Sequence, residues 1–275
     1  MTTGEWIQEA QGRLREAGIE SAAIEAQLLA AHVLLRDRTY VLAHPGEEFP
    51  DLPGESLLQR RERHEPLAYI LGWREFYGRR FHVEPGVLIP RHETEILVEA
   101  ALGFLKSAGR PMKVLDLGTG SGCIGITLKL EFPAADVTLS DISERAVEIA
   151  RANAGELGAT VECVVADGFA GLGAFDLIVT NPPYVGLAET LPAEVRDFEP
   201  ASALFPGEDG LEFYEMLAAT AGLHLAGEGP LIMEVGYRQA REVGAIFEAA
   251  GWTVDQVVRD LSGIERVVVV HQLSA

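Results

Sequence analysis

Four consecutive residues have the types needed to hold a planar amide group. The quartet Asn181-Pro182-Pro183-Tyr184 directly follows the apolar run at 177–180. Each proline holds φ near −65° and lacks an N–H, so the carbonyls of Asn181 and Pro182 remain as acceptors in a stiff turn. Pro182 also drives Asn181 toward an extended backbone. The quartet therefore predicts a rigid pair of hydrogen-bond acceptors beside the ring of Tyr184.

Such a pair of acceptors suits a planar nitrogen that carries two hydrogens. The carboxamide oxygen of Asn181 can accept one hydrogen and the Pro182 carbonyl can accept the other. Together they would orient the nitrogen lone pair toward an electrophile and favour the developing positive charge. Tyr184 can stack on a planar amide or on a nucleobase. We therefore predict catalytic roles for Asn181, Pro182 and Tyr184, and substrate binding by these three residues and Pro183.

A glycine-rich turn is the second candidate site, and two interpretations of it remain open. The segment Asp116-Leu117-Gly118-Thr119-Gly120-Ser121-Gly122 ends an apolar run and opens a predicted helix. Residues 120–125 formally match the G-x-G-x-x-G dinucleotide fingerprint, which is a weak signal when it stands alone. With Asp116 included, the pattern becomes D-x-G-x-G-x-G. That carboxylate would repel a pyrophosphate, but it suits a cationic sulfonium ligand such as S-adenosylmethionine.

Two further carboxylates follow later apolar runs. Asp141 lies 21 residues after Gly120, where an acidic residue in nucleotide sites binds ribose hydroxyls, although a helix N-cap is the competing interpretation. Asp167 precedes Gly168. It can accept a hydrogen bond from the adenine amino group, or it can simply form a turn. The predicted cofactor-binding residues from these motifs are Asp116, Gly118, Thr119, Gly120, Ser121, Gly122, Asp141, Asp167 and Gly168.

The elements that must position these residues alternate along the chain from residue 93 onward. Apolar runs predict buried strands at 113–117, 137–140, 161–165, 177–180, 231–235 and 267–271, and helical stretches lie at 122–130, 144–157 and 238–250. This alternation predicts an α/β fold with a mostly parallel sheet and helices on both faces. Ligands in such sheets bind beyond the carboxyl ends of the strands, where all the motifs above fall.

The N-terminal quarter has a different pattern. Apolar side chains recur at helical spacing through residues 4–72, and no useful strand pattern appears there. Phe76-Tyr77-Gly78 and Phe81-His82-Val83 flank a turn-like Gly-Arg-Arg, which predicts a β-hairpin. We therefore predict a small helical domain over 1–72, a hairpin connection over 73–90 and an α/β domain over 91–275.

Charge and composition limit the classes of function. The net charge is −20, and residues 91–275 hold 12 basic and 28 acidic side chains, a net charge of −16. A phosphate backbone would be repelled by such a domain, so no direct binding of nucleic acid is expected. Basic residues concentrate instead between positions 60 and 80, where they form either a solvated face or a docking patch for a partner: Arg60, Arg61, Arg63, Arg74, Arg79 and Arg80.

Other features of the composition indicate the compartment. No apolar run approaches the ~18 residues of a membrane span, and the N-terminus shows no signal-peptide pattern, so a cytoplasmic protein without membrane contact is expected. Cys123 and Cys163 lie in periodic apolar segments and are predicted to be buried thiols. The histidines show no metal-ligand spacing with cysteines or acids, so no metal site is predicted.

Longer blocks of the chain are similar to a known family. With the glycine turn and the Asn181 quartet, these blocks make the sequence resemble the bacterial release-factor glutamine-N5 methyltransferases over nearly its whole length. The blocks are Pro66-Leu67-Ala68-Tyr69-Ile70-Leu71-Gly72, Glu75-Phe76-Tyr77-Gly78, Pro85-Gly86-Val87-Leu88-Ile89-Pro90-Arg91 with Glu95, and Gly263-Ile264-Glu265-Arg266-Val267.

The resemblance implies a Rossmann-like methyltransferase domain preceded by helices that recognise the substrate. It implies that S-adenosylmethionine donates a methyl group to the side-chain amide of the glutamine in the Gly-Gly-Gln motif of class 1 peptide chain release factors. It also implies that Asn181 contacts the cofactor as well as the glutamine. One segment departs from the family: Pro90-Arg91-His92-Glu93-Thr94-Glu95 stands where Pro-Arg-Pro-Asp-Thr-Glu is usual, and activity is expected to survive this change.

Three alternatives remain beside this interpretation. An N6-adenine methyltransferase acting on DNA or RNA shares the Asn-Pro-Pro-Tyr quartet, but it predicts a basic cleft. A nicotinamide dehydrogenase built on residues 120–125 leaves the quartet unexplained. A non-catalytic adaptor that keeps the cofactor fold has no need of the quartet, because binding alone does not require it.

Overall fold

The computed structural model describes residues 1–272, which divide into two compact units. The first unit comprises Met1–Trp73 together with Leu191–Phe198. The second comprises Arg74–Thr190 and the residues from Glu199 onward. The smaller unit thus takes in one short segment that is distant in sequence from the rest of it.

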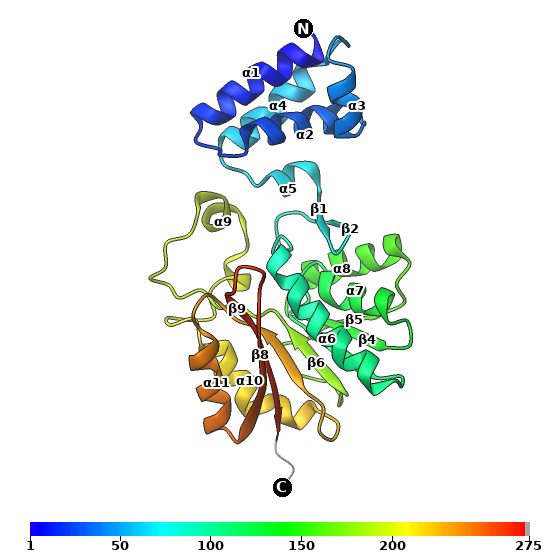
Figure 1. Ribbon diagram of the computed structural model, residues 1–275, viewed down its shortest axis with the longest axis vertical. Helices are drawn as coiled ribbons and strands as arrows, with labels where there is room; N and C mark the ends of the chain where they lie inside the picture. The colour runs from blue at the N-terminus through cyan, green and yellow to red at the C-terminus, as the bar shows by residue number, and fades with distance from the viewer. Residues whose placement is uncertain (273–275) are drawn as a thin grey trace. The chain divides into compact units, whose positions relative to one another are not determined.

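The first unit consists of helices, which Figure 1 labels. They are α1 (Thr3–Glu16), α2 (Ala22–Leu34), α3 (Arg38–Ala43), α4 (Asp51–Glu62), α5 (Leu67–Leu71) and α9 (Ala193–Phe198). The helices from α1 to α5 contribute side chains to an apolar centre. The start of α1 carries a capping box, in which Thr2 and Glu5 satisfy each other's backbone N–H. Trp6 stacks on Phe49 with ring centroids 4.4 Å apart, and both lie in the core with Leu14 and Leu29. The helical pattern read from the sequence therefore forms one packed core.

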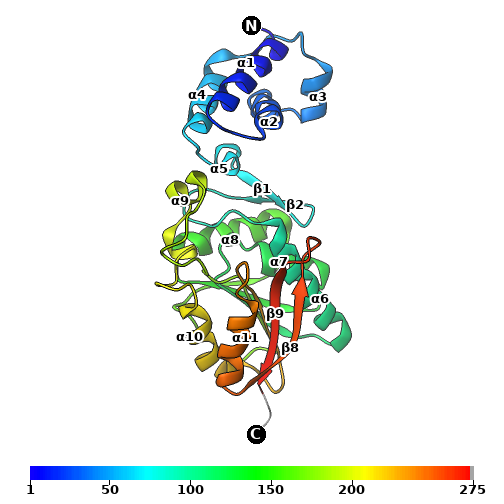
Figure 2. The same cartoon turned by 60° about the vertical axis from the view of Figure 1, so that its left-hand side comes forward.

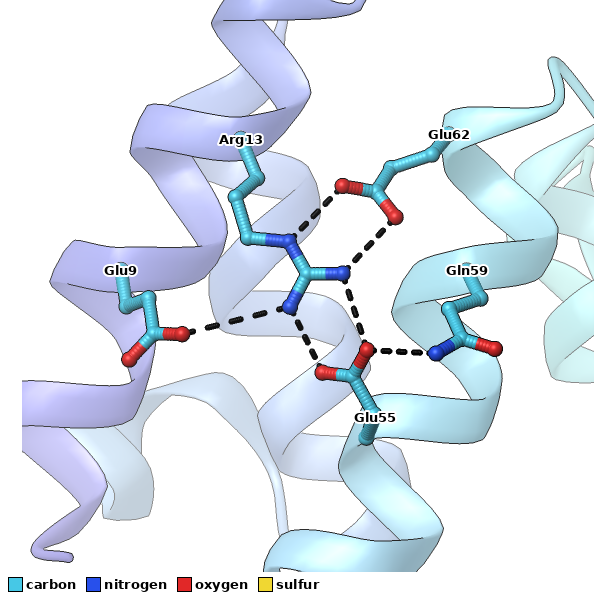
Figure 3. A network of polar contacts seen from close by, with 5 residues as sticks. All are labelled: Glu9, Arg13, Glu55, Gln59 and Glu62. Carbon is cyan, nitrogen blue, oxygen red and sulfur yellow. Dashed lines mark hydrogen bonds and ion pairs between the residues drawn. The ribbon is translucent and has the colours of Figure 1, made fainter.

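Ion pairs join the helices of this unit around that core. The Arg13 guanidinium of α1 bonds Glu55 at 2.6 Å and Glu62 at 2.8 Å, both on α4, as Figure 3 shows. Arg61 of α4 bonds Glu25 of α2 at 2.5 Å and Glu194 of α9 at 3.0 Å. Because Arg61 is only 5% exposed, it is a structural residue of the helical unit and is not part of an exposed basic patch.

The second unit is built on a seven-stranded sheet with the order β5-β4-β3-β6-β7-β9-β8. Its strands are β3 (Lys113–Leu117), β4 (Asp136–Asp141), β5 (Glu162–Val165), β6 (Leu177–Thr180), β7 (Leu231–Glu234), β8 (Trp252–Arg259) and β9 (Glu265–Gln272). The first five pair in parallel, and β9 lies antiparallel between β7 and β8. The predicted mostly parallel α/β sheet is confirmed, but edge strand β8 was not predicted.

Helices cover both faces of this sheet (Figure 2). One core contains side chains of α6 (Glu95–Ala108), α7 (Cys123–Glu131) and α8 (Glu144–Leu157). The other contains side chains of α10 (Glu212–Thr220) and α11 (Ala240–Ala249). Val114 belongs to the first core and Leu115 to the second, as the alternation of side chains along a strand requires. Short 3-10 turns lie at His92–Thr94, Ala201–Ala203 and Ala221–His224.

The predicted hairpin is present as β1 (Trp73–Phe76) and β2 (Arg79–His82). Tyr77 and Gly78 between them have φ of 51° and 70°, as the turns that suit a twisted two-stranded ribbon require. Phe76 and Phe81 meet edge to face, with ring centroids 6.0 Å apart. Glu95 accepts a hydrogen bond from the Tyr77 N–H at 2.9 Å, so the turn is anchored at the start of α6.

The two cysteines differ in burial. Cys123 is buried, and burial raises the pKa of its thiol to about 12. Cys163 is only half-buried, so the prediction of two buried thiols is wrong for this residue. Its strand, β5, is one of the two edge strands of the sheet and is partly exposed along its length. Among residues 1–272, no helix is both long enough and apolar enough to span a bilayer.

Candidate functional site

A pocket of about 170 Å³ opens at the carboxyl ends of β3, β4 and β6. Its wall contains many of the residues predicted from the sequence motifs, namely Gly118, Gly120, Asp141, Asp167, Gly168, Asn181, Pro182 and Pro183. The other predicted residues, Asp116, Thr119, Ser121, Gly122 and Tyr184, do not line it. Segments that the sequence motifs did not identify complete the wall, including Gly86, Val87, Leu88, Ser202 and Phe213.

The glycine turn brings backbone N–H groups of residues 118–120 against the next strand. Gly118 and Thr119 both donate to the Ser140 carbonyl at 2.9 Å, and Gly120 donates to Asp141 Oδ2 at 2.9 Å. Gly118 and Gly120 have φ of 71° and 55°, which side chains with a Cβ rarely adopt. Both residues line the pocket, so a ligand there meets bare backbone.

Asp116 acts behind this turn. It is fully buried, and its Oδ2 accepts from the Thr119 hydroxyl at 2.6 Å and from the Gly125 N–H at 2.9 Å. Burial raises the pKa of this carboxyl to about 6, against the effect of these two hydrogen bonds. Its Oδ1 is buried without a partner among the described residues. Asp116 therefore holds the turn in shape, while the pocket wall itself is formed by the glycines.

Asp141 faces the pocket with both carboxylate oxygens held in place. Oδ2 accepts from Gly120, and Oδ1 accepts from the Ser143 N–H at 2.9 Å. The N-cap of α8 is Ser143, whose side chain accepts from the Ala146 N–H. Because another residue caps the helix, the lone pairs of Asp141 that remain are available for a ligand.

Asp167 and Gly168 follow β5 and also line the pocket. The Asp167 carbonyl accepts from the Ala170 N–H at 3.0 Å, and the preceding residue, Ala166, donates to the Asp141 carbonyl at 2.9 Å. Gly168 has φ of 55°. Asp167 therefore begins a turn and at the same time lies on the pocket wall, so the two interpretations of this residue are compatible.

Asn181 carries an unused acceptor. The hydroxyl of Thr180 donates to the Leu117 carbonyl at 2.8 Å, which fixes the end of β6. The Asn181 amide nitrogen, Nδ2, donates to Thr94 Oγ1 at 3.2 Å. Its Oδ1 is buried and has no partner among the described residues. Buried polar atoms are rarely left unpaired, so this oxygen is a candidate acceptor for a ligand N–H.

Tyr184 is the last residue of the quartet, but it does not line the pocket. Its hydroxyl donates to Glu234 Oε1 at 3.4 Å, and its carbonyl accepts from Gln239 Nε2 at 3.0 Å. A Cβ at position 236 would lie 2.9 Å from the Tyr184 ring, so Gly236 gives the ring its space. Burial raises the pKa of the Tyr184 hydroxyl well above its usual range. The hydrogen bond to Glu234 therefore holds the ring outside the pocket lining.

Several buried polar residues of the site had no signal in the sequence motifs. Glu199 accepts from the Ile89 N–H at 3.1 Å and pairs with Arg91, which anchors the chain just after the pocket-lining segment 86–88. Asn153 of α8 donates to the Ser121 carbonyl at 2.8 Å and to the His82 carbonyl at 3.0 Å, so it joins the glycine turn to the hairpin. Thr94 accepts a hydrogen bond from Asn181 Nδ2, and Glu234 accepts one from the Tyr184 hydroxyl. Of this group, Arg91 and Thr94 lie in the segment 90–95, which was compared with the family in the sequence.

The chemistry of the pocket is set by its charges. Its lining includes Asp141 and Asp167 and contains no lysine or arginine among the described residues. No group of three or more metal-binding side chains occurs within residues 1–272. The pocket thus combines bare glycine backbone, two carboxylates and one unpaired carboxamide oxygen.

Comparisons with known proteins match both units. The model of the PrmC N-terminal domain matches residues 5–72, and the methyltransferase small domain matches residues 92–202. A release factor glutamine methyltransferase of Koribacter versatilis is 43% identical over 277 residues, covering 98% of each chain. A bifunctional methyltransferase of Rickettsia bellii is 37% identical over 297 residues; the match covers 96% of this chain but spans only 53% of that protein.

A solved structure shows the same fold. A methyltransferase from Pyrococcus furiosus superposes with a TM-score of 0.52 at 20% identity, and the match covers 71% of this chain and 89% of that one. At this identity the similarity concerns the fold alone.

Proposed function

We propose, because this chain belongs to the release factor glutamine methyltransferase family, that it methylates a glutamine side chain. The methyl group comes from S-adenosylmethionine, and the acceptor is the amide nitrogen of the glutamine in the Gly-Gly-Gln motif of class 1 peptide chain release factors. The observation that carries this proposal is the buried, unpaired Asn181 Oδ1 beside a glycine-lined pocket. The reaction takes place in the cytoplasm.

The pocket lining fits S-adenosylmethionine. Gly118 and Gly120 line the pocket with bare backbone and would leave room for the amino-acid part of the molecule. Asp141 would accept from the ribose hydroxyls, and Asp167 would accept from the adenine amino group. A nicotinamide dinucleotide would leave the Asn181 quartet without a role. When bound, S-adenosylmethionine supplies an electrophilic methyl group on a positively charged sulfur.

The quartet would orient the glutamine amide, whose nitrogen is a weak nucleophile. Asn181 Oδ1 accepts one hydrogen of the glutamine NH2 and the Pro182 carbonyl accepts the other, which turns the nitrogen lone pair toward the methyl group. The hydrogen bonds from the nitrogen to these two acceptors become stronger as the nitrogen gains positive charge. Methyl transfer would form the N–C bond and break the S–C bond, and the nitrogen would then release a proton to water. No general base is required before attack.

Electrostatics favours a protein acceptor over an adenine in nucleic acid. The same two acceptors would fit the exocyclic NH2 of adenine. However, the pocket lining has two carboxylates and no basic side chain among the described residues, and residues 91–275 carry a net charge of −16. Phosphates would be repelled from this site.

The helices of residues 1–72 are the proposed recognition domain for the release factor, followed by the hairpin connection over 73–90 and the catalytic domain over 91–275. The matched PrmC N-terminal domain supports this assignment. Because Arg61 is buried in ion pairs, it contributes to this unit's stability, and recognition depends on other side chains.

The proposal is tested by mass spectrometry of the acceptor. Purified protein and S-adenosylmethionine are offered a class 1 release factor and, separately, an adenine-containing duplex. We expect one methyl group on the glutamine that follows two glycines. Asn181→Ala should abolish it, while Gln256→Ala, an amide removed from the exposed strand β8, should leave it unchanged. Methylation of adenine with none on protein would refute the proposal.

A further inference from the structure

Two segments that lie far apart in the sequence both contribute to the pocket wall. The first wall segment, residues 86–91, contributes its first three residues to the lining, and the second wall segment, residues 199–204, contributes Pro200, Ser202 and Ala203. Neither wall segment belongs to a strand of the sheet or to an α-helix. The hydrogen bonds of the sheet therefore do not hold them in place, and another contact must do so.

Glu199 joins the two wall segments. It stands directly before Pro200, and its Oε2 accepts from the Ile89 N–H of the first segment at 3.1 Å. Its Oε1 accepts from the Arg91 guanidinium. The Glu199 side chain is only 1% exposed, so water hardly competes for either oxygen. Both oxygens of one buried carboxylate are therefore used to hold the second wall segment against the first.

Hydrogen bonds also link both wall segments to the quartet. In the first segment, the Arg91 carbonyl accepts from the Thr94 N–H at 3.2 Å, and Thr94 Oγ1 accepts from the carboxamide that opens the quartet. In the second segment, the Leu204 carbonyl accepts at 2.9 Å from the N–H of Val185, the residue that follows the quartet. Glu199 therefore closes a chain of contacts that runs from one end of the quartet to the other.

The position of Glu199 along the chain gives a reason for such an anchor. Residues Leu191–Phe198 belong to the helical unit, so Glu199 is the residue at which the chain returns to the second unit. Without an anchor there, any displacement of Leu191–Phe198 would pass along the backbone to Pro200 and the rest of the second wall segment. A buried carboxylate is costly unless its hydrogen bonds are satisfied, and here both oxygens have a partner.

We propose that Glu199 is a positioning residue for the cofactor, which holds the two wall segments together before S-adenosylmethionine binds. Such preorganisation reduces the entropy lost on binding, so the consequence is expected in cofactor affinity. The inference rests on the proposed function only for the use of this pocket as the cofactor site, because no contact with the methyl acceptor enters it.

Glu199→Gln tests the proposal while keeping the shape of the side chain. The amide has an acceptor oxygen on one side and an NH2 group on the other, so it cannot accept from both Ile89 and Arg91 in their present places. We expect the Kd for S-adenosylhomocysteine, measured by calorimetry on the full chain, to rise roughly tenfold or more. An unchanged Kd would overturn the inference.

Glu131→Gln is the matched control for this change. Glu131 pairs with Arg79 at 2.5 Å, is partly exposed and does not line the pocket. Its loss should leave the Kd for S-adenosylhomocysteine within about twofold of the unaltered protein. An equal rise in Kd for Glu131→Gln and Glu199→Gln would overturn the inference, because any lost carboxylate would then have the same effect.

Loss of stability by itself should not have this effect on the cofactor. Arg61→Met breaks the buried pair with Glu25 and the bond to Glu194 of α9, but it leaves Glu199 in place. We expect it to lower the stability of the helical unit, with the Kd for S-adenosylhomocysteine within about twofold of the unaltered protein. A rise as large as that of Glu199→Gln would overturn the inference, because cofactor affinity would then follow stability.

A further measurement reports the contact itself and needs no methyl acceptor. Glu199→Ala removes both acceptors, so hydrogen exchange of the Ile89 amide, followed by NMR on the full chain, should become at least ~10-fold faster. Equal exchange would overturn the inference even if the enzyme methylates release factors. Faster exchange together with weaker cofactor binding, in a protein that methylates only adenine, would support the inference while the proposed function fails.

Discussion

The backbone N–H of Gly120 donates to Asp141 Oδ2 at 2.9 Å, so the glycine turn after β3 is tied to the carboxyl end of β4. The two residues are 21 positions apart in the sequence, so the folded sheet brings them together. The bond orders two parts of the pocket wall before any ligand binds, which reduces the entropy lost on binding. The Asp141 carboxylate thus holds the glycine turn, and it is also the proposed acceptor for the ribose hydroxyls.

Removal of this carboxylate should weaken cofactor binding. Asp141→Ala deletes the acceptor proposed for the ribose hydroxyls, and hydrogen bonds to charged groups are worth about 1.5–3 kcal/mol, so we expect the Kd for S-adenosylmethionine to rise at least ~10-fold. Asp136→Ala is the control, because it removes an exposed carboxylate from the opposite end of the same strand. Calorimetry measures both, and equal affinities would contradict the proposed ribose contact.

Gly125 should not tolerate a side chain. A Cβ there would overlap Leu139 Cδ2 and lie 3.0 Å from Asp116 Cβ. We expect Gly125→Ala to lower the free energy of unfolding by about 1–3 kcal/mol through overpacking. Gly155→Ala is the matched change in α8, where a Cβ meets nothing within 4 Å, and it should stabilise by up to about 1 kcal/mol. Urea unfolding compares them; equal effects would show that α7 can shift to admit the methyl group.

The buried Arg61 should be essential to the helical unit. Arg61→Met leaves Glu25 buried without its 2.5 Å partner, and breaking such a pair costs about 3–5 kcal/mol. Arg60→Met removes the adjacent arginine, whose side chain is 39% exposed and pairs with Glu65, and it should cost at most about 1 kcal/mol. Denaturant unfolding of the full chain separates them. Hydrogen exchange should also rise in α9, which loses its bond from Arg61 to Glu194; unchanged exchange there would argue against this anchor.

Two buried carboxyls should make the protein less stable as pH rises. Burial raises the pKa of Glu234 from 4.5 to about 7 and that of Asp116 from 3.8 to about 6. Between the unfolded and folded pKa values the folded state binds more protons, so stability falls as pH increases through this window. For Glu234 the loss between about pH 4.5 and 7 is on the order of 3 kcal/mol.

Glu234→Gln tests this pH dependence. The amide does not titrate, so its stability should decline less than that of the unaltered protein between pH 5 and 8 in urea unfolding. Glu99→Gln, on the exposed face of α6, is the control and should leave the slope unchanged. Parallel curves for the unaltered protein and Glu234→Gln would mean that Glu234 does not titrate in this range.

The sequence predicted those parts of the fold that depend on local pattern. Strands β3, β4 and β6 are buried apolar runs, and each is followed by residues whose chemistry stands out, such as Gly118 or Pro182. The parallel sheet then places those residues at one edge, because carboxyl ends of parallel strands coincide. Strand β8 was not predicted. Its middle residues, Asp255 and Gln256, are exposed and the strand contains a bulge. The bulge interrupts the alternation of apolar and polar residues that marks a strand.

By itself the sequence determined the family and the α/β architecture, and it predicted the acceptor pair of the quartet, since these rest on residue types at short spacing. The tertiary structure alone decided how that pair is held. Thr94 and Asn181 are 87 positions apart, and Arg91 and Glu199 are 108 apart. No local pattern encodes such contacts, because they exist only once the strands and helices have packed and excluded water from these polar groups. The same packing made Asp116 a support for the glycine turn and turned Tyr184 toward Glu234.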